Sequence, residues 1–160
     1  PRIEAHQLLL VSESQTATPA ALYSGWPLDK AGDLHATHGG RLHTTDGATA
    51  VTLDSLVHTL ALSHIDLLKL DVDGHELAVL EGAKATVARF QPKIMVELAP
   101  HVYSDPADFD RLLRLFWEAG YEFTTPPFMR SLPHAPAALR AAIPLRGGIN
   151  ALAMPSRSAV

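Results

Sequence analysis

IDLLKLDVDGHELAVLEGAKATVARFQPKIMVEL, residues 65–98, is the stretch of the chain that decides its fold. An apolar run ends at Asp71 and is followed by a short turn with Asp73 and Gly74, a segment of helical periodicity, and a second apolar run that contains Glu97. This order of strand, turn, helix and strand is typical of an α/β protein with a parallel sheet. Ligands bind at the carboxyl edge of such a sheet, so we expect Asp71 and Glu97 to face the same ligand.

The middle of this stretch predicts a single helix over residues 76–90. Its apolar residues recur at intervals of three and four and would form one face: Leu77, Leu80, Ala83, Val87 and Phe90. Asp73 and Glu76 have the spacing of a capping box, so Asp73 is predicted to cap the helix. The strand at residues 65–72 is nearly all apolar, which favours burial by helices on both faces of the sheet.

Elsewhere the pattern predicts fewer elements. Asp105 and Pro106 indicate the start of a helix that ends at Gly120. Strands are predicted at residues 93–98, 121–125 and 150–154, and a further strand at residues 3–11.

The segments KLDVDGHELAVLEGA and PKIMVEL closely resemble the FkbM-type methyltransferases. The matching residues are Lys69, Asp71, Gly74, Glu76, Leu80, Gly82 and Ala83, whereas Asp73 stands where the family more often has Glu. VTLDSL at residues 51–56 resembles the short helix that precedes this unit in the family. GGINALAMP at residues 147–155 resembles the family's last strand.

The resemblance implies a Rossmann-like class I methyltransferase sheet, mainly parallel with an antiparallel last strand. It also implies that S-adenosylmethionine is the methyl donor and that the acceptor is a hydroxyl group of a sugar or another natural product. The family's glycine-rich cofactor turn has no counterpart, because the glycine pairs at 39–40 and 147–148 lie outside a strand–turn–helix context. We therefore expect residues 1–160 to be the C-terminal portion of a single methyltransferase domain, truncated at its N-terminus.

Two other classes of protein stay open at this point. One is a nucleotide- or NAD-binding enzyme of related topology, which the missing glycine-rich turn does not separate from a methyltransferase. The other is a non-catalytic remnant of such a domain that acts as an interaction module.

Three residues are predicted to be catalytic. Asp71, at the tip of its strand, would orient the acceptor or the cofactor, and Glu97 or His101 would accept the proton of the hydroxyl group. Glu97 has an alternative role as the ion-pair partner of a neighbour such as Lys69.

The predicted cofactor contacts are Asp71 together with Val11 and Ser12, which follow the strand at residues 3–11. His35, His38 and His43 lie in a polar segment without Cys and without helical register, so we expect a solvated loop and no metal site.

Composition limits the partners and the location. The formal net charge of −4 argues against a nucleic-acid-binding surface, and no apolar stretch approaches the length of a membrane span. The absence of Cys excludes disulfides. We expect a cytoplasmic protein that acts on a small-molecule or saccharide acceptor. If residues 65–72 form an unpaired sheet edge, we expect either homo-oligomers through that edge or a rearrangement in which another segment covers it.

Overall fold

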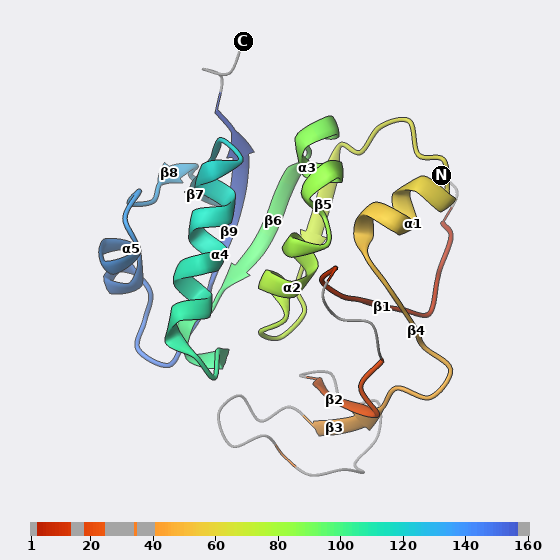
Figure 1. Ribbon diagram of the computed structural model, residues 1–160. Coiled ribbons are helices and arrows are strands. Elements are labelled where there is room, and N and C mark those ends of the chain that lie inside the picture. The colour runs from red at the N-terminus through yellow and green to blue at the C-terminus, as the bar shows by residue number, and fades with distance from the viewer. Residues whose placement is uncertain (1–2, 14–17, 25–33, 35–40, 157–160) are drawn as a thin grey trace.

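A five-stranded sheet forms the centre of the described structure, which comprises residues 3–13, 18–24, 34 and 41–156 of a computed structural model (Figure 1). From one edge to the other, its strands are β5 (Leu67–Leu70), β6 (Lys93–Leu98), β9 (Ile149–Pro155), β7 (Tyr121–Thr125) and β8 (Arg130–Ser131). The strands predicted within residues 65–72, 93–98, 121–125 and 150–154 are confirmed.

The strand directions differ from the predicted, mainly parallel arrangement. β5 and β6 are parallel, whereas the pairs β6–β9, β9–β7 and β7–β8 are antiparallel. The expected antiparallel last strand is confirmed. The prediction of a mainly parallel sheet is wrong. β9 lies antiparallel between β6 and β7, which run in the same direction, and β8 forms a hairpin with β7 at the far edge.

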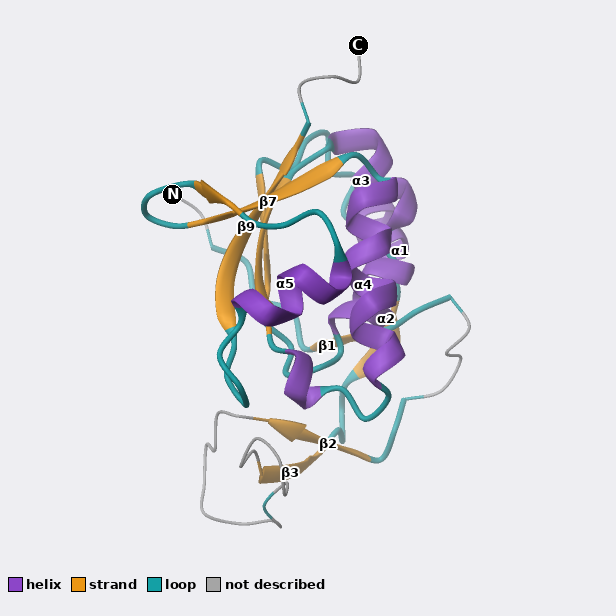
Figure 2. Ribbon diagram, turned by 90° about the vertical axis from the view of Figure 1, so that its left-hand side faces the viewer, coloured by secondary structure: helices purple, strands orange, loops and turns teal. Residues whose placement is uncertain are grey.

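All helices but the last lie on one side of the sheet, and the last lies beside the sheet edge formed by β8 (Figures 1 and 2). The helices are α1 (Leu53–Thr59), α2 (Glu76–Glu81), α3 (Lys84–Phe90), α4 (Pro106–Glu118) and α5 (Pro136–Ala142). Strand residues that face them are buried, for example Ile94 and Ala151, whereas Leu67 on the opposite face is 54% exposed. The expectation that helices cover both faces is therefore wrong for the part of the chain that the structure describes.

The helix predicted for residues 76–90 is two helices, α2 and α3, which are separated at Gly82 and Ala83. The predicted capping box is also wrong. Asp73 has a φ of 49° and Gly74 a φ of 96°, and the N-cap residue of α2 is His75. The backbone turns from β5 into α2 through this left-handed conformation, which removes Asp73 from the capping position.

Asp54 of α1 joins the two helices at their break. Its carboxylate accepts hydrogen bonds from the amides of Ala85 (3.0 Å) and Thr86 (2.7 Å) in the first turn of α3. Its own amide donates to the carbonyl of Gly82 (2.9 Å). A Cβ atom on Gly82 would clash with the carbonyl oxygen of Val11. The close approach of these backbone segments therefore requires glycine at position 82.

α4 begins and ends where the sequence predicts. The Asp105 side chain accepts a hydrogen bond from the amide of Ala107 (2.8 Å), Pro106 is the first helical residue, and Gly120 follows the helix with a φ of 81°. The apolar face of α4 is buried against the sheet, including Phe109.

Two strand pairs lie outside the main sheet. β1 (Leu8–Leu10) is parallel to β4 (Thr49–Val51), and β2 (Ala21–Ser24) is antiparallel to β3 (Arg41–Thr44). The strand predicted over residues 3–11 is therefore shorter, and it pairs with β4 and not with the main sheet. β4 has only three residues, which is too short to give a periodic signal.

β5 is the outer strand of the main sheet, so the predicted unpaired edge has no partner strand among the described residues. Oligomers formed through this edge stay a prediction. Within the described ranges, no helix is long and apolar enough to cross a membrane.

Substitution of Gly82 tests the junction of α1, α2 and α3. Gly82→Ala should lower the free energy of unfolding by about 1–3 kcal/mol, because the added methyl group forces backbone segments apart. Urea denaturation measures the difference. Gly147→Ala is the control, since Gly147 lies in a loop and its nearest neighbours are atoms of Pro144. Equal stability of the two variants would contradict the close packing at Gly82.

Candidate functional site

The carboxyl ends of β5 and β6 bring together the residues predicted to be catalytic. Glu97 lies near the end of β6, and its electrostatic neighbours are Asp71, Glu76 and Asp73, which raise its pKa, and His101, which lowers it. The structure thus places Asp71, Glu97 and His101 in one neighbourhood, as the sequence predicts. Their catalytic roles stay predictions.

Glu97 is a half-buried carboxylate in a crowded position. Burial raises its pKa above the ordinary value, and the negative charge of Asp71 is the next largest cause. On the neighbouring strand Glu97 is paired with Asn150, and a Cβ atom on Gly148 would clash with its carboxylate oxygen. Gly148 therefore leaves the space that this side chain occupies.

Lys69 forms an ion pair with Asp71, two residues further along the chain. The alternative that Lys69 pairs with Glu97 is wrong, because the ammonium group reaches the carboxylate at the tip of its own strand. Both side chains are partly exposed, so the Asp71 carboxylate stays accessible to a ligand.

Glu76 fixes the shape of this edge. It is 3% exposed, and its Oε1 accepts hydrogen bonds from the amides of Val72 (3.4 Å) and Gly74 (3.2 Å). Its Oε2 accepts a hydrogen bond from the hydroxyl of Tyr103 (2.6 Å). One buried carboxylate therefore links the turn after β5 with the loop after β6.

Tyr103 is held on its other side by an aromatic contact. Its ring meets the ring of Phe109 edge to face, with centroids 5.7 Å apart. Burial, and secondly the charge of Glu76, raise the pKa of Tyr103 well above its ordinary value, so the hydroxyl stays protonated and donates to Glu76.

His101 lies in η1 (Pro100–Val102), a short 3-10 turn that follows β6. Its Nδ1 atom is buried and has no hydrogen-bond partner among the described residues. His101 also borders a cavity of about 270 Å³, whose lining includes Arg140 and Arg146.

A second cavity, of about 410 Å³, lies between this edge and the β2–β3 hairpin. The edge contributes the turn at residues 73–75 and the loop at residues 102–104, and α4 contributes Asp108. Figure 1 shows the hairpin below the carboxyl ends of β5 and β6.

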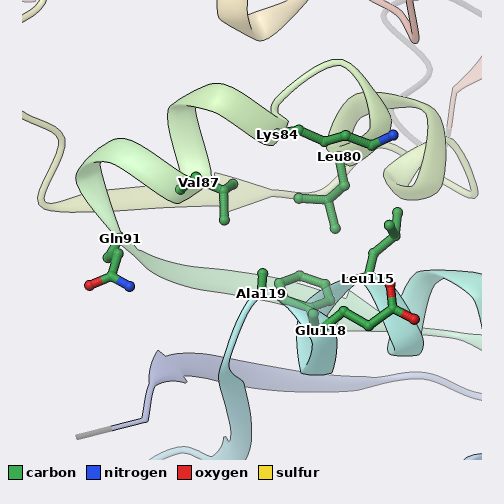
Figure 3. Close-up of a pocket in the computed structure, with 9 residues that line it drawn as sticks. Leu80, Lys84, Val87, Gln91, Leu115, Glu118 and Ala119 are labelled. Atoms are coloured by element: carbon green, nitrogen blue, oxygen red, sulfur yellow. The ribbon is translucent and has the colours of Figure 1, made fainter. Parts of the chain in front are cut away.

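A third cavity, of about 470 Å³, is on the helix layer between α3 and α4 (Figure 3). Its lining includes Gln91 and Ala119, which precede β6 and β7. The groove therefore lies toward the amino ends of the strands, away from Asp71 and Glu97.

Val11 and Ser12, the other predicted cofactor contacts, are both buried. The Val11 amide donates to the carbonyl of Val51 (3.0 Å). Their contact with a cofactor stays a prediction. His35 and His38 lie outside the described residues. His43 belongs to β3, and no group of three or more His, Asp or Glu residues suited to a metal occurs in the described ranges.

Three features of the edge were not predicted from the sequence: the hydrogen bond from Tyr103 to Glu76, the space that Gly148 leaves, and the cavity beside the hairpin. The glycine pair at 147–148, beside the last predicted strand, is a signal for close packing that could have located the second feature. The other two depend on contacts between distant segments, for which the sequence has no local signal.

The family model described as Methyltransferase FkbM domain matches residues 5–123, which is more than half of the chain. No curated protein and no solved structure matches this chain. The matched range includes β5, α2, β6 and the predicted catalytic residues.

The hydrogen bond from Tyr103 to Glu76 can be tested by removing the hydroxyl group. Tyr103→Phe should lower the free energy of unfolding by about 1.5–3 kcal/mol, because it takes a donor from a buried carboxylate. Tyr121→Phe is the matched control and should cost only about 1 kcal/mol, because the Tyr121 hydroxyl donates to the neutral carbonyl of Pro92 (2.9 Å). Urea denaturation measures the loss of unfolding free energy in both variants. A smaller loss for Tyr103→Phe would contradict the role given to Glu76.

The raised pKa of Glu97 predicts a pH dependence of stability. Because the folded state holds this proton more tightly than the unfolded chain, the contribution of Glu97 is complete below the unfolded pKa. It is lost as the pH rises through the raised pKa of the folded state. The stability of Glu97→Gln should therefore increase relative to that of the wild type as the pH rises from about 4 to about 8.

Urea denaturation at a series of pH values measures this difference. Glu122→Gln, at an exposed position of β7, is the reference for removal of a surface carboxylate. A difference between Glu97→Gln and the wild type that stays constant across the pH range would show that Glu97 is not perturbed by its surroundings.

Proposed function

Since the chain belongs to the FkbM methyltransferase domain family, we propose that it transfers a methyl group from S-adenosylmethionine to a hydroxyl group of a sugar or related natural product. The observation that carries the proposal is the convergence of Asp71, Glu97 and His101 at one sheet edge within the matched range. Ligands of open α/β sheets bind at this edge.

The chemistry of the edge fits the donor. S-adenosylmethionine, when bound, supplies a methyl group on a positively charged sulfur, which is a good leaving group. The cluster of Asp71, Asp73 and Glu97 gives the edge a negative potential that favours a nearby cation. Asp71, accessible at the strand tip, is the residue we expect to hold the donor or to orient the acceptor.

Glu97 is the residue that we assign as the general base. A raised pKa makes a carboxylate a stronger base, and the space left by Gly148 fixes its position. With the donor bound, Glu97 would accept the proton that the hydroxyl group loses when it takes up the methyl group. The electrostatic interaction with His101 lowers the pKa of the Glu97 carboxyl group. His101 therefore adjusts the strength of Glu97 as a base.

The donor is tested separately from the acceptor. Calorimetry with S-adenosylhomocysteine, the product of the donor, on the complete natural protein should show binding that Asp71→Asn weakens. Binding of NAD in place of S-adenosylhomocysteine would support the alternative of a nucleotide-dependent enzyme. Binding of neither compound would contradict the proposed function.

Methyl transfer tests the roles at the edge. With labelled S-adenosylmethionine and a panel of glycosides, Glu97→Gln should lower kcat by about 10²–10⁴-fold, the usual contribution of a general base. Gly148→Ala should also lower kcat while the protein stays folded. The methyl group that this substitution adds displaces the Glu97 side chain. Gly147→Ala is the adjacent control. Turnover of Glu97→Gln within about twofold of the wild type would show that Glu97 is not the base.

A further inference from the structure

The cavity that His101 borders has no part in the methyl transfer described above, yet its lining is rich in nitrogen-bearing side chains. Its volume of about 270 Å³ is small for a whole drug-sized ligand, so it suits a single group of a larger molecule. Its walls are η1, which follows β6, and the segment from α5 to the turn before β9. Besides His101, these walls contribute Arg140 and Arg146.

Arg140 is held in place before any ligand binds. Its Nε atom donates to Oδ1 of Asp110 (3.0 Å), and its Nη2 atom lies 2.9 Å from the same oxygen. Nη2 also donates to the carbonyl of Pro106, and Cζ lies 4.9 Å from the centroid of the Phe109 ring. None of these contacts uses Nη1. The ion pair balances the charge of Arg140, but the Nη1 atom keeps two donors that suit an oxyanion.

Arg146 is a charge without a counter-charge. It is exposed, and no hydrogen bond or ion pair joins it to another described residue. It is the third residue of a turn that the amide of Gly147 closes on the carbonyl of Pro144 (2.9 Å), and its φ is 57°. Gly or Asn is usual at such a position, because other side chains disfavour a positive φ. An arginine there indicates that its side chain has a function that offsets the backbone cost.

His101 adds a buried nitrogen atom that a ligand oxygen could satisfy. Its Nδ1 atom has no hydrogen-bond partner among the described residues, whereas buried polar atoms normally have one. Of the described residues that line the cavity, none is Asp or Glu. Two carboxylates act on the lining from outside it, since Asp110 pairs with Arg140 and Glu97 interacts with His101. The charge of Arg146 is left over, so the cavity favours an anion.

The cavity adjoins the residue assigned as the general base. His101 acts electrostatically on Glu97, and a Cβ atom on Gly148, directly after the turn that carries Arg146, would clash with the Glu97 carboxylate. A group bound in the cavity is therefore close to Glu97. Guanidinium groups bind carboxylate and phosphate groups through paired N–H donors.

We propose that this cavity binds an oxyanion, a carboxylate or phosphate group that the methyl acceptor carries, and that Arg140, Arg146 and His101 donate to it. The acceptor part of this assignment rests on the proposed function, because the cavity adjoins Glu97. It makes the acceptor an acidic compound and Arg146 a determinant of specificity.

Calorimetric titrations of the complete natural protein at fixed ionic strength test the anion site without any need for turnover. The anionic probes are glycerophosphate and glycerate, and glycerol is their neutral counterpart. At least one anionic probe should bind about tenfold or more tightly than glycerol, because it gains charge-assisted hydrogen bonds. Inorganic phosphate should compete with that probe for the same site.

Substitution of Arg146 tests which residue holds the anion. Arg146→Gln should weaken binding of the anionic probe by at least about tenfold. Arg146→Gly should weaken it as much and raise the midpoint of thermal unfolding, because Gly adopts a positive φ without strain. Arg114→Gln, at an exposed position of α4 outside the lining of this cavity, is the matched control and should bind like the wild type. No binding of either anion, or equal effects of Arg146→Gln and Arg114→Gln, would overturn the proposal.

Competition with S-adenosylhomocysteine, which has a carboxylate of its own, identifies the source of the anion. Simultaneous binding of this compound and the anionic probe supports the acceptor as the source. Displacement of the probe would show that the cavity holds the donor's carboxylate, and the acceptor assignment would be wrong.

The outcome for the cavity is separate from that for the donor. If S-adenosylhomocysteine binds and neither anionic probe does, the present inference fails while the methyltransferase proposal stands. If an anionic probe binds through Arg146 and S-adenosylhomocysteine does not bind, the cavity is an anion site and the proposed methyl transfer fails.

Discussion

Glu76 accepts hydrogen bonds from two amides and one phenol while almost completely removed from solvent. A carboxylate in such a position is stable only when its oxygens are satisfied by donors. The donors come from the turn after β5 and the loop after β6, so these two segments cannot move independently. Asp71, the half-buried Glu97 and the cavity beside the hairpin lie around this link.

Two carboxylates near this link have different surroundings. Asp71 has Lys69 as a partner and partial access to solvent, whereas Glu97 is partly buried and lies near other negative charges. Neighbouring acids in different surroundings commonly take different roles in active sites. Here the difference supports a ligand-holding role for Asp71 and a proton-accepting role for Glu97.

Much of the secondary structure followed from local patterns. The limits of α4 were predictable because Asp105, Pro106 and Gly120 act through contacts within one or two turns. The break at Gly82 was not, because the amides of α3 are satisfied by Asp54, thirty or so residues away. Likewise, the position of β9 inside the sheet depends on long-range pairing that periodicity does not reveal. At the site, the predicted acids were brought together, whereas the hydrogen bond from Tyr103 to Glu76 emerged only from tertiary contacts.

Native-state hydrogen exchange of the Val72 and Gly74 amides tests the central role of Glu76 most directly. In the wild-type protein both amides should be protected, because they donate to the buried carboxylate. Tyr103→Phe does not alter either amide, yet it should reduce the protection of both by loosening Glu76. Protection unchanged in this variant, in a protein that remains folded, would show that the two loops are held independently and would contradict the account.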